Sequence, residues 1–149
     1  MNIRLATKDE LCLLADIRMD FLLETANKDM SNEFKEETIK YMQKHFEDKT
    51  FFCVLAEKEN KIIATVMFCL YNHLPKATNP TGKIAYLFNV YTVPEYRGAQ
   101  TGTKVLEKTL SLIQDAGVNE IHIKAEYKAI PLYKRLGFKH TDQSMVLQF

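Results

Sequence analysis

The residues from Arg97 to Thr103 combine a permanent positive charge with glycines at the start of a predicted helix. A helix start carries N–H groups without internal partners, and the aligned peptide dipoles leave partial positive charge there. Gly98 and Gly102 let the backbone approach a ligand with no Cβ in the way, and Arg97 adds a forked donor. This combination predicts a pocket for phosphate oxygens. The spacing matches neither the P-loop pattern nor the dinucleotide pattern GxGxxG.

A strand, a helix and a second strand are predicted to position this loop. Ile84 to Val93 is apolar at both odd and even positions, which indicates a central strand covered on both faces. The helix from Gly102 to Ala116 carries an apolar stripe, and Gly117 is typical of a helix end. Val118 to Ala125 is the next predicted strand, and the crossover connection makes it parallel to the strand before the loop.

The rest of the chain predicts a mixed α/β sheet with helices on both faces. Its elements are a strand at 3–6, a helix after the capping-box sequence Thr7–Glu10, a helix from Ser31 to about Glu47, an antiparallel hairpin of 50–56 and 61–71, a helix through Ala129–Leu136, and a final hairpin of 138–140 and 144–149 turning at Asp142-Gln143. Gly137 ends the last helix, and Pro131 is harmless within its first turn.

Composition predicts one globular domain spanning residues 1–149, with 46% hydrophobic and 26% charged residues. A net charge of +1 argues against a general affinity for nucleic acid or membrane surfaces, and no apolar run approaches the length of a bilayer span. Cys12, Cys53 and Cys69 lie in apolar segments and are interpreted as buried, reduced thiols of a cytoplasmic protein. The four histidines lack metal-ligand spacing, so no metal site is predicted.

Two segments resemble motifs of the GNAT acyltransferases. VPEYRGAQTGTKVLEKTL is similar to motif A, which has Arg or Gln, two residues, Gly, one residue, and then Gly or Ala. Arg97 matches the first position and Gly102 the last, whereas Gln100 stands where glycine is usual. AIPLYKRLGF, from Ala129 to Phe138, resembles the A-x-x-L-Y-x-x-x-G-F segment of the same family. The resemblance implies the GNAT fold, in which the two middle parallel strands splay apart and acyl-CoA lies in the gap.

The resemblance also implies transfer of an acetyl group from acetyl-CoA to a primary amine of a small molecule, a peptide or a protein. The cofactor diphosphate would bind the N–H groups of Arg97, Gly98, Ala99, Gln100, Thr101, Gly102 and Thr103. The pantetheine arm would pair as an extra strand with Val90, Tyr91 and Thr92, and Ala129 is also assigned to the cofactor site. Tyr133 is the implied proton donor to the leaving thiolate, although its helical spacing also fits a core aromatic.

Two features of the sequence depart from this family. Some relatives use a glutamate as base at the position of Tyr86, so Glu24, Glu57, Glu126, a water chain or an already deprotonated amine all stay open here. If the Gln100 position has a positive φ, its side chain costs about 1 kcal/mol or more and crowds the diphosphate, but its amide could itself donate to a phosphate oxygen. Coenzyme binding is therefore expected to be weakened and not abolished.

Two alternatives to an active enzyme remain. The first is a GNAT-fold module that binds acyl-CoA without turnover, which the departures at Gln100 and Tyr86 favour. The second is a nucleotide-phosphate binder of another class, disfavoured because no acidic metal-ligand pattern accompanies the loop. No nucleic-acid or membrane partner is expected, and a homodimer is left open.

Overall fold

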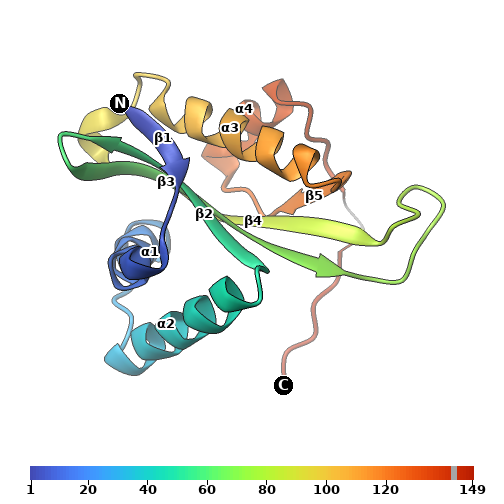
Figure 1. The fold of residues 1–149 in the computed structure, drawn as a ribbon, viewed down its shortest axis with the longest axis horizontal. Helices are drawn as coiled ribbons and strands as arrows, with labels where there is room; N and C mark the ends of the chain where they lie inside the picture. Colours follow the sequence, from blue (N-terminus) through green and yellow to red (C-terminus); the bar gives the residue numbers. More distant parts are fainter. Residues whose placement is uncertain (142–143) are drawn as a thin grey trace.

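The computed structural model describes residues 1–141 and 144–149 and has a single sheet with helices on both faces (Figure 1). Its strands are β1 (Asn2–Leu5), β2 (Phe51–Lys58), β3 (Lys61–Asn72), β4 (Lys83–Thr92) and β5 (Glu120–Ile123). Its helices are α1 (Leu11–Ala26), α2 (Asn32–Glu47), α3 (Thr101–Asp115) and α4 (Ile130–Arg135). The strands lie side by side in chain order, antiparallel from β1 to β4, and β5 is parallel to β4 as the crossover predicts. The predicted α/β fold class is confirmed.

The sheet is covered on both sides because its side chains alternate between two apolar clusters. Val54 and Ala56 of β2 face the first cluster, whereas Cys53 and Leu55 face the second. Burial of each large apolar side chain contributes about 1.5–3 kcal/mol. The α3 helix closes the first cluster with Val105, Leu106 and Ile113, and α1 and α2 close the second with Leu11, Leu14 and Met42. These two layers fix the position of β4 between α1 and α3 (Figure 1).

The predicted helix caps are present. The Ser31 hydroxyl accepts a hydrogen bond from the Phe34 N–H at 3.1 Å, which begins α2. The Thr7 N–H donates to the Glu10 carboxylate at 2.8 Å, which completes the capping box before α1. Gly117, with a φ of 75°, follows the last turn of α3, where a residue with a Cβ would be strained.

A small ion-pair network ties the capping box to the first strands. Arg4 of β1 donates to Glu10 at 2.7 Å and to Glu57 of β2 at 2.8 Å. The hydrogen bonds from Arg4, followed by those from Thr7, lower the pKa of Glu10 to about 2. Because the folded pKa lies below the unfolded value, this contribution to stability is complete above about pH 4.5 and is lost as the pH falls toward 2.

Glu10→Gln is therefore expected to lower the free energy of unfolding at pH 7 by about 1 kcal/mol, since the amide keeps the cap but loses the ion pair. Urea unfolding between pH 2 and pH 7 should show the difference from the parent chain shrinking below about pH 4.5. Glu47→Gln is the control, because Glu47 pairs with Lys8 on an exposed surface. An equal effect at every pH would contradict the role of the charge.

The predicted final hairpin is wrong in the described residues. Residues 138–140 and 144–149 form no strand, and the predicted turn at Asp142-Gln143 lies outside the described residues. The apolar pattern of the last segment favours a strand, but a strand needs a neighbouring edge with which to pair its backbone. Within the described chain this segment has no such neighbour, and it leaves the body as an extended arm (Figure 1).

The three cysteines are free, as predicted, but they differ in burial. Cys53 is buried and Cys69 half-buried, whereas Cys12 is exposed, so the prediction of burial is wrong there. Cys12 follows the buried Leu11 on α1 and falls on the outer side of the helix. Across residues 1–141 and 144–149, no helix is both long and apolar enough to cross a membrane. The same residues gather no metal-binding cluster of His, Cys, Asp and Glu side chains.

Candidate active site

The two parallel strands β4 and β5 separate halfway along β4. They pair from Ile84 opposite Glu120 to Leu87 opposite Ile123, and β5 ends there. β4 continues to Thr92 while pairing only with β3 on its other side. Val90, Tyr91 and Thr92 therefore present a strand edge with no partner on the β5 side in the described residues. An extended, amide-rich ligand can pair with such an edge.

A β-bulge reshapes β4 where this separation begins. Asn89 and Val90 together lie opposite the single residue Val66, and Asn89 has a φ of 52°. Asn89 is only 2% exposed, and its side chain donates to the Thr65 hydroxyl at 3.4 Å. Arg18 of α1 donates to the other side of the same amide at 3.4 Å. The bulge bends β4 and is held by side chains from α1 and β3.

The loop after β4 carries a row of free amides. The Lys104 N–H is the first in α3 to reach a carbonyl, that of Gln100, at 3.0 Å. Within the described chain the N–H groups from Gly98 to Thr103 donate to no backbone or side-chain acceptor, while Arg97 N–H donates to Pro94 at 3.2 Å. Free amides together with the α3 dipole make an anion-binding site. Gly98, Ala99 and Gln100 are exposed and Gly102 and Thr103 half-buried, whereas the predicted site residue Thr101 is buried.

Gly102 lets the start of α3 approach the end of β4. A Cβ built at Gly102 would lie 2.7 Å from the Thr92 hydroxyl oxygen and 3.9 Å from the Thr92 Cβ. The first distance is a clash and the second an ordinary contact. Glycine at this position therefore brings the free amides of the loop next to the free edge of β4.

The Arg97 guanidinium contacts groups of β4 and α1. Its guanidinium donates to the Thr92 carbonyl at 2.8 Å and pairs with Glu24 of α1 at 2.7 Å. It also lies over the Tyr91 ring, with 5.7 Å between the guanidinium carbon and the ring centroid. The hydrogen bond from Arg97 lowers the pKa of Glu24. The predicted phosphate-binding cation thus has its charge partly compensated, and it fastens the loop to both β4 and α1.

Gln100 adopts the left-handed backbone conformation, with a φ of 60° and a ψ of 11°. The condition on which the sequence argument depended, a positive φ at this position, is therefore met. A residue with a Cβ is strained in this region by about 1–2 kcal/mol. The loop therefore carries a local strain at the position where the family motif has glycine.

Gln100→Gly is expected to raise the free energy of unfolding by about 1 kcal/mol, because glycine adopts this conformation without strain. It should also tighten the binding of coenzyme A, since it removes a side chain beside the free amides. Urea unfolding and calorimetric titration measure the two effects. Gln114→Gly is the matched control, because Gln114 lies within α3, where glycine costs about 1 kcal/mol. A loss of stability in Gln100→Gly would show that the glutamine side chain makes a compensating contact.

Tyr133 lies in the short helix α4 and is 6% exposed. Its ring packs edge-on against Phe138, with the centroids 5.6 Å apart. It belongs to the apolar cluster against which Val90 and Ala129 also pack, so α4 and the free part of β4 meet in one core. Burial raises the pKa of Tyr133 to about 12, so its hydroxyl stays protonated and can donate. The side chain also lines a cavity of about 330 Å³ between β5 and α4.

The three candidate bases lie in different surroundings. Glu57 pairs with Arg4 between β1 and β2, away from β4 in the strand order, and the structure does not bring it to the site. Glu24 pairs with Arg97, and its lowered pKa makes it a poor proton acceptor. Glu126 follows β5, is exposed, and makes no ion pair within the described residues.

Sequence reasoning missed two parts of this site. The contacts of Arg18 with Asn89 and of Glu24 with Arg97 join residues 71 and 73 positions apart. Of these residues, only Arg18 stands out in the sequence, because its charge interrupts the apolar stripe of α1. Such an interruption indicates a buried polar partner, but the sequence does not say which one.

Comparison with known proteins places these features in a family. A model of the acetyltransferase (GNAT) family matches residues 19–138. Thialysine N-epsilon-acetyltransferase from Mus musculus is 29% identical over 106 residues, which are 66% of this chain and 61% of that protein. Glucosamine 6-phosphate N-acetyltransferase from Trypanosoma brucei brucei is 26% identical over 73 residues, 49% of this chain and 50% of that protein. The match thus spans less than two thirds of either relative.

A solved structure covers nearly the whole chain. A predicted acetyltransferase from Clostridium acetobutylicum, crystallised with acetyl-CoA, is 28% identical to this chain. The two superimpose with a TM-score of 0.91 over 99% of this chain and 95% of the other. The mixed sheet and its flanking helices are therefore shared along nearly their full length.

Proposed function

The chain belongs to the acetyltransferase (GNAT) family, and from this premise we propose that it transfers the acetyl group of acetyl-CoA to a primary amine. One observation carries the proposal. The edge of β4 from Val90 to Thr92 is free on the β5 side, and it adjoins the free amides from Gly98 to Thr103. The first feature suits the amide-rich pantetheine arm, and the second suits the diphosphate.

Different residues of the site would bind different parts of the coenzyme. Backbone N–H groups from Gly98 to Thr103 would hold the diphosphate, with the α3 dipole adding to their attraction. Arg97 would keep the loop in place through Thr92 and Glu24 and contribute the rest of its charge. Ala129, at the start of α4, presents a small side chain toward the apolar cluster shared with Val90.

The chemistry then needs alignment and one proton donor. Binding both substrates together makes the attack effectively intramolecular, which can lower the barrier by up to about 7–11 kcal/mol. The neutral amine attacks the thioester carbonyl, a C–N bond forms, and the C–S bond breaks. The departing sulfur carries the electron pair and would take its proton from the Tyr133 hydroxyl, and the proton lost by the amine nitrogen would return to the Tyr133 oxygen, directly or through water. Because burial raises the pKa of Tyr133 to about 12, its hydroxyl keeps its proton at neutral pH and is a weak acid toward a thiolate.

The acceptor we propose is a small-molecule amine. The names of both curated relatives point to small amine substrates, thialysine and glucosamine 6-phosphate. The amine either arrives deprotonated or loses its proton through water, since Glu24 and Glu57 are engaged with arginines. Glu126 is the remaining carboxylate candidate. The free thiols support a reducing, cytoplasmic setting, and we propose residues 1–149 as one catalytic unit.

A second candidate function is binding of acyl-CoA without turnover, which the strained Gln100 favours. One experiment separates the two. Acetyl-CoA should raise the melting temperature of the chain in either case, whereas only the enzyme releases free thiol when amines are added. Thiol release is measured across a panel of amino acids, amino sugars, polyamines and peptides. Thermal stabilisation without thiol release from any of them would favour the binding module, and no stabilisation at all would overturn both.

A further inference from the structure

Arg18 of α1 is a half-buried cation that has no anionic partner among the described residues. Its guanidinium donates to the side-chain oxygen of Asn89 at 3.4 Å, which is a long hydrogen bond, and its central carbon lies 5.6 Å from the centroid of the Phe21 ring. A guanidinium has five N–H donors, and in the described part of the chain no second acceptor reaches them. Burial lowers the pKa of Arg18, and no neighbouring carboxylate raises it.

Two acidic neighbours of Arg18 on α1 are already paired with other cations. Glu24 pairs with Arg97 at 2.7 Å, and Asp16 pairs with Lys35 of α2. Taking a charge partly out of water costs free energy unless an opposite charge offsets the cost. An anion bound at Arg18 would supply that opposite charge, and the described side chains do not.

Successive turns of α1 contact successive positions from the bulge of β4 to the loop before α3. The pairs are Arg18 with Asn89, Phe21 with Tyr91, and Glu24 with Arg97. The diphosphate would lie at the loop, so the pantetheine arm along Val90–Thr92 would direct its thioester toward the bulge. Arg18 therefore lies at the end of the free edge where the acetyl group would be held.

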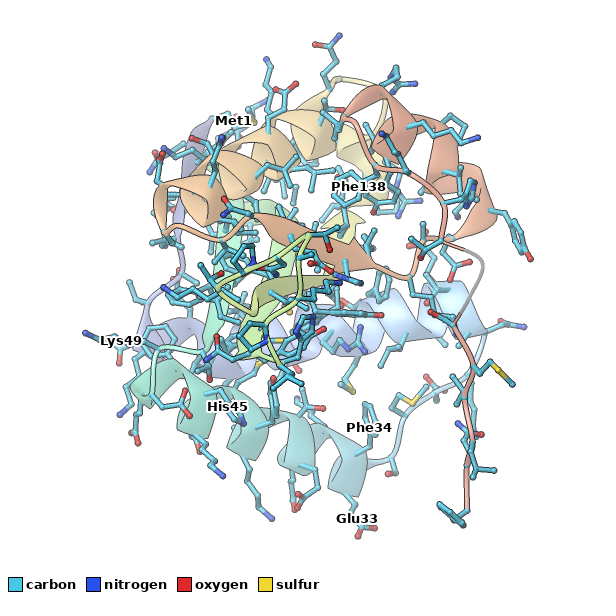
Figure 2. The ribbon with its side chains drawn as sticks, turned by 90° about the vertical axis from the view of Figure 1, so that its right-hand side faces the viewer. Met1, Glu33, Phe34, His45, Lys49 and Phe138 are labelled. Atoms are coloured by element: carbon cyan, nitrogen blue, oxygen red, sulfur yellow. The ribbon has the colours of Figure 1, made fainter. Side chains whose placement is uncertain are left out.

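Arg18 and the implied proton donor lie on different sides of the sheet. Tyr133 and Phe138 belong to the cluster on the α3 side, whereas α1 and α2 close the cluster on the other side. Figure 2 shows this division, with Phe138 on one side of the sheet and α2, which carries the labelled His45, on the other. An amine that approaches the thioester from the side opposite Tyr133 passes Arg18.

We propose that Arg18 binds an anionic group of the acceptor, so that the substrate is a primary amine carrying a carboxylate or a phosphate ester. The inference rests on the proposed acetyl transfer and names the substrate class for it. A guanidinium binds either group through two parallel N–H donors. Phe21 and Asn89 hold the Arg18 guanidinium in place while its other donors stay available. The pairing would fix one end of the acceptor and leave its amine free to attack the thioester.

The test is calorimetric titration of the full chain with matched pairs of amines, with and without coenzyme A, which carries no acetyl group and allows no turnover. The anionic probes are the ω-amino acids from glycine to aminohexanoate, O-phosphoethanolamine and aminopropyl phosphate. Their uncharged counterparts are the corresponding amino amides, ethanolamine and aminopropanol. At least one anionic probe should bind the parent chain about tenfold more tightly than its counterpart, which is the scale of one hydrogen bond to a charged group. Added salt should weaken the binding of that probe and leave its counterpart unchanged.

Two variants and a control assign the preference to Arg18. Arg18→Gln removes the charge and should reduce the preference for the anionic probe to less than about twofold, whereas Arg18→Lys keeps the charge and should retain part of it. Arg135→Gln is the matched control, because Arg135 is exposed on α4. Comparing two ligands within one variant cancels any general loosening of the bulge, so a purely structural role of Arg18 would leave the ratio unchanged.

These outcomes decide the role of Arg18 without an activity assay. A parent chain that binds no anionic probe more tightly than its counterpart would overturn the proposal, and so would a preference that Arg18→Gln retains. Thiol release tests the acetyl transfer separately. A preference lost in Arg18→Gln, without thiol release from any amine, would support the anion site and overturn the transfer, whereas thiol release without any preference would do the reverse.

Discussion

Tyr133→Phe is expected to lower turnover about 100-fold while the dissociation constant of acetyl-CoA changes less than twofold. The variant removes one oxygen and keeps the ring that packs against Phe138, so the core should stay intact. General acid catalysis contributes about 10²–10⁴-fold. The lower end applies because burial raises the pKa of Tyr133 to about 12, well above that of a thiol, which is about 8.5.

The raised pKa of Tyr133 also predicts how turnover depends on pH. A group with a pKa near 12 keeps its proton throughout the neutral and mildly alkaline range. Turnover of the parent enzyme should therefore not fall between about pH 8 and pH 10 through ionisation of Tyr133. Tyr127→Phe is the control, because Tyr127 is 90% exposed just before α4 and should have no effect. Equal turnover of Tyr133→Phe and the parent with a good substrate would remove Tyr133 from the mechanism.

Features that depend on neighbouring residues could be predicted from the sequence. The unit from β4 through the loop to α3 was predictable because a two-sided apolar strand and a helix start are local patterns. The strain at Gln100 could be stated from the sequence only as a condition, because it depended on whether this motif position has a positive φ. The family resemblance supplied the separation of β4 from β5, which no periodicity shows.

Features that depend on distant contacts could not be predicted. Asp16, Asp20 and Glu24 form an exposed acidic row along α1 in the sequence pattern, and only the packing of α1 near the end of β4 brings Glu24 to Arg97. The positive φ of Asn89 has no local signal beyond its residue type. The prediction of a final hairpin was wrong because an apolar pattern is not enough for a strand, and 138–140 and 144–149 pair with no strand in the described residues.

One physical cause separates the features that could be predicted from the sequence from those that could not. Local conformation follows from the residues of a segment, whereas an ion pair or a strand pairing also depends on where the other member lies. The free backbone amides from Gly98 to Thr103 could therefore be predicted from the sequence, whereas the side-chain contacts of Arg18 and Glu24 could not. Gly102 is the clearest case, because its role is to let two backbone segments meet.

Gly102→Ala is expected to weaken acetyl-CoA binding about tenfold, which corresponds to about 1.4 kcal/mol. The new Cβ would lie 2.7 Å from the Thr92 hydroxyl oxygen. Thr92 cannot readily turn this oxygen away, because a β-branched side chain in a strand is restricted at χ1. The start of α3 must then move away from β4, and the amides of the loop move with it. Calorimetric titration with acetyl-CoA measures the loss.

A second substitution tests the reason for that loss. Thr92→Ala removes the hydroxyl and leaves a distance of 3.9 Å between the two Cβ positions, which is an ordinary contact. The double variant Gly102→Ala with Thr92→Ala should therefore recover most of the affinity, while Thr92→Ala alone should bind nearly as the parent does. Failure of the rescue would show that the Cβ obstructs the ligand itself, and normal binding by Gly102→Ala would show that the approach of α3 to β4 is not needed. Recovery would locate the binding determinant in the spacing of two backbone segments, as the free amides of the loop and the free edge of β4 require.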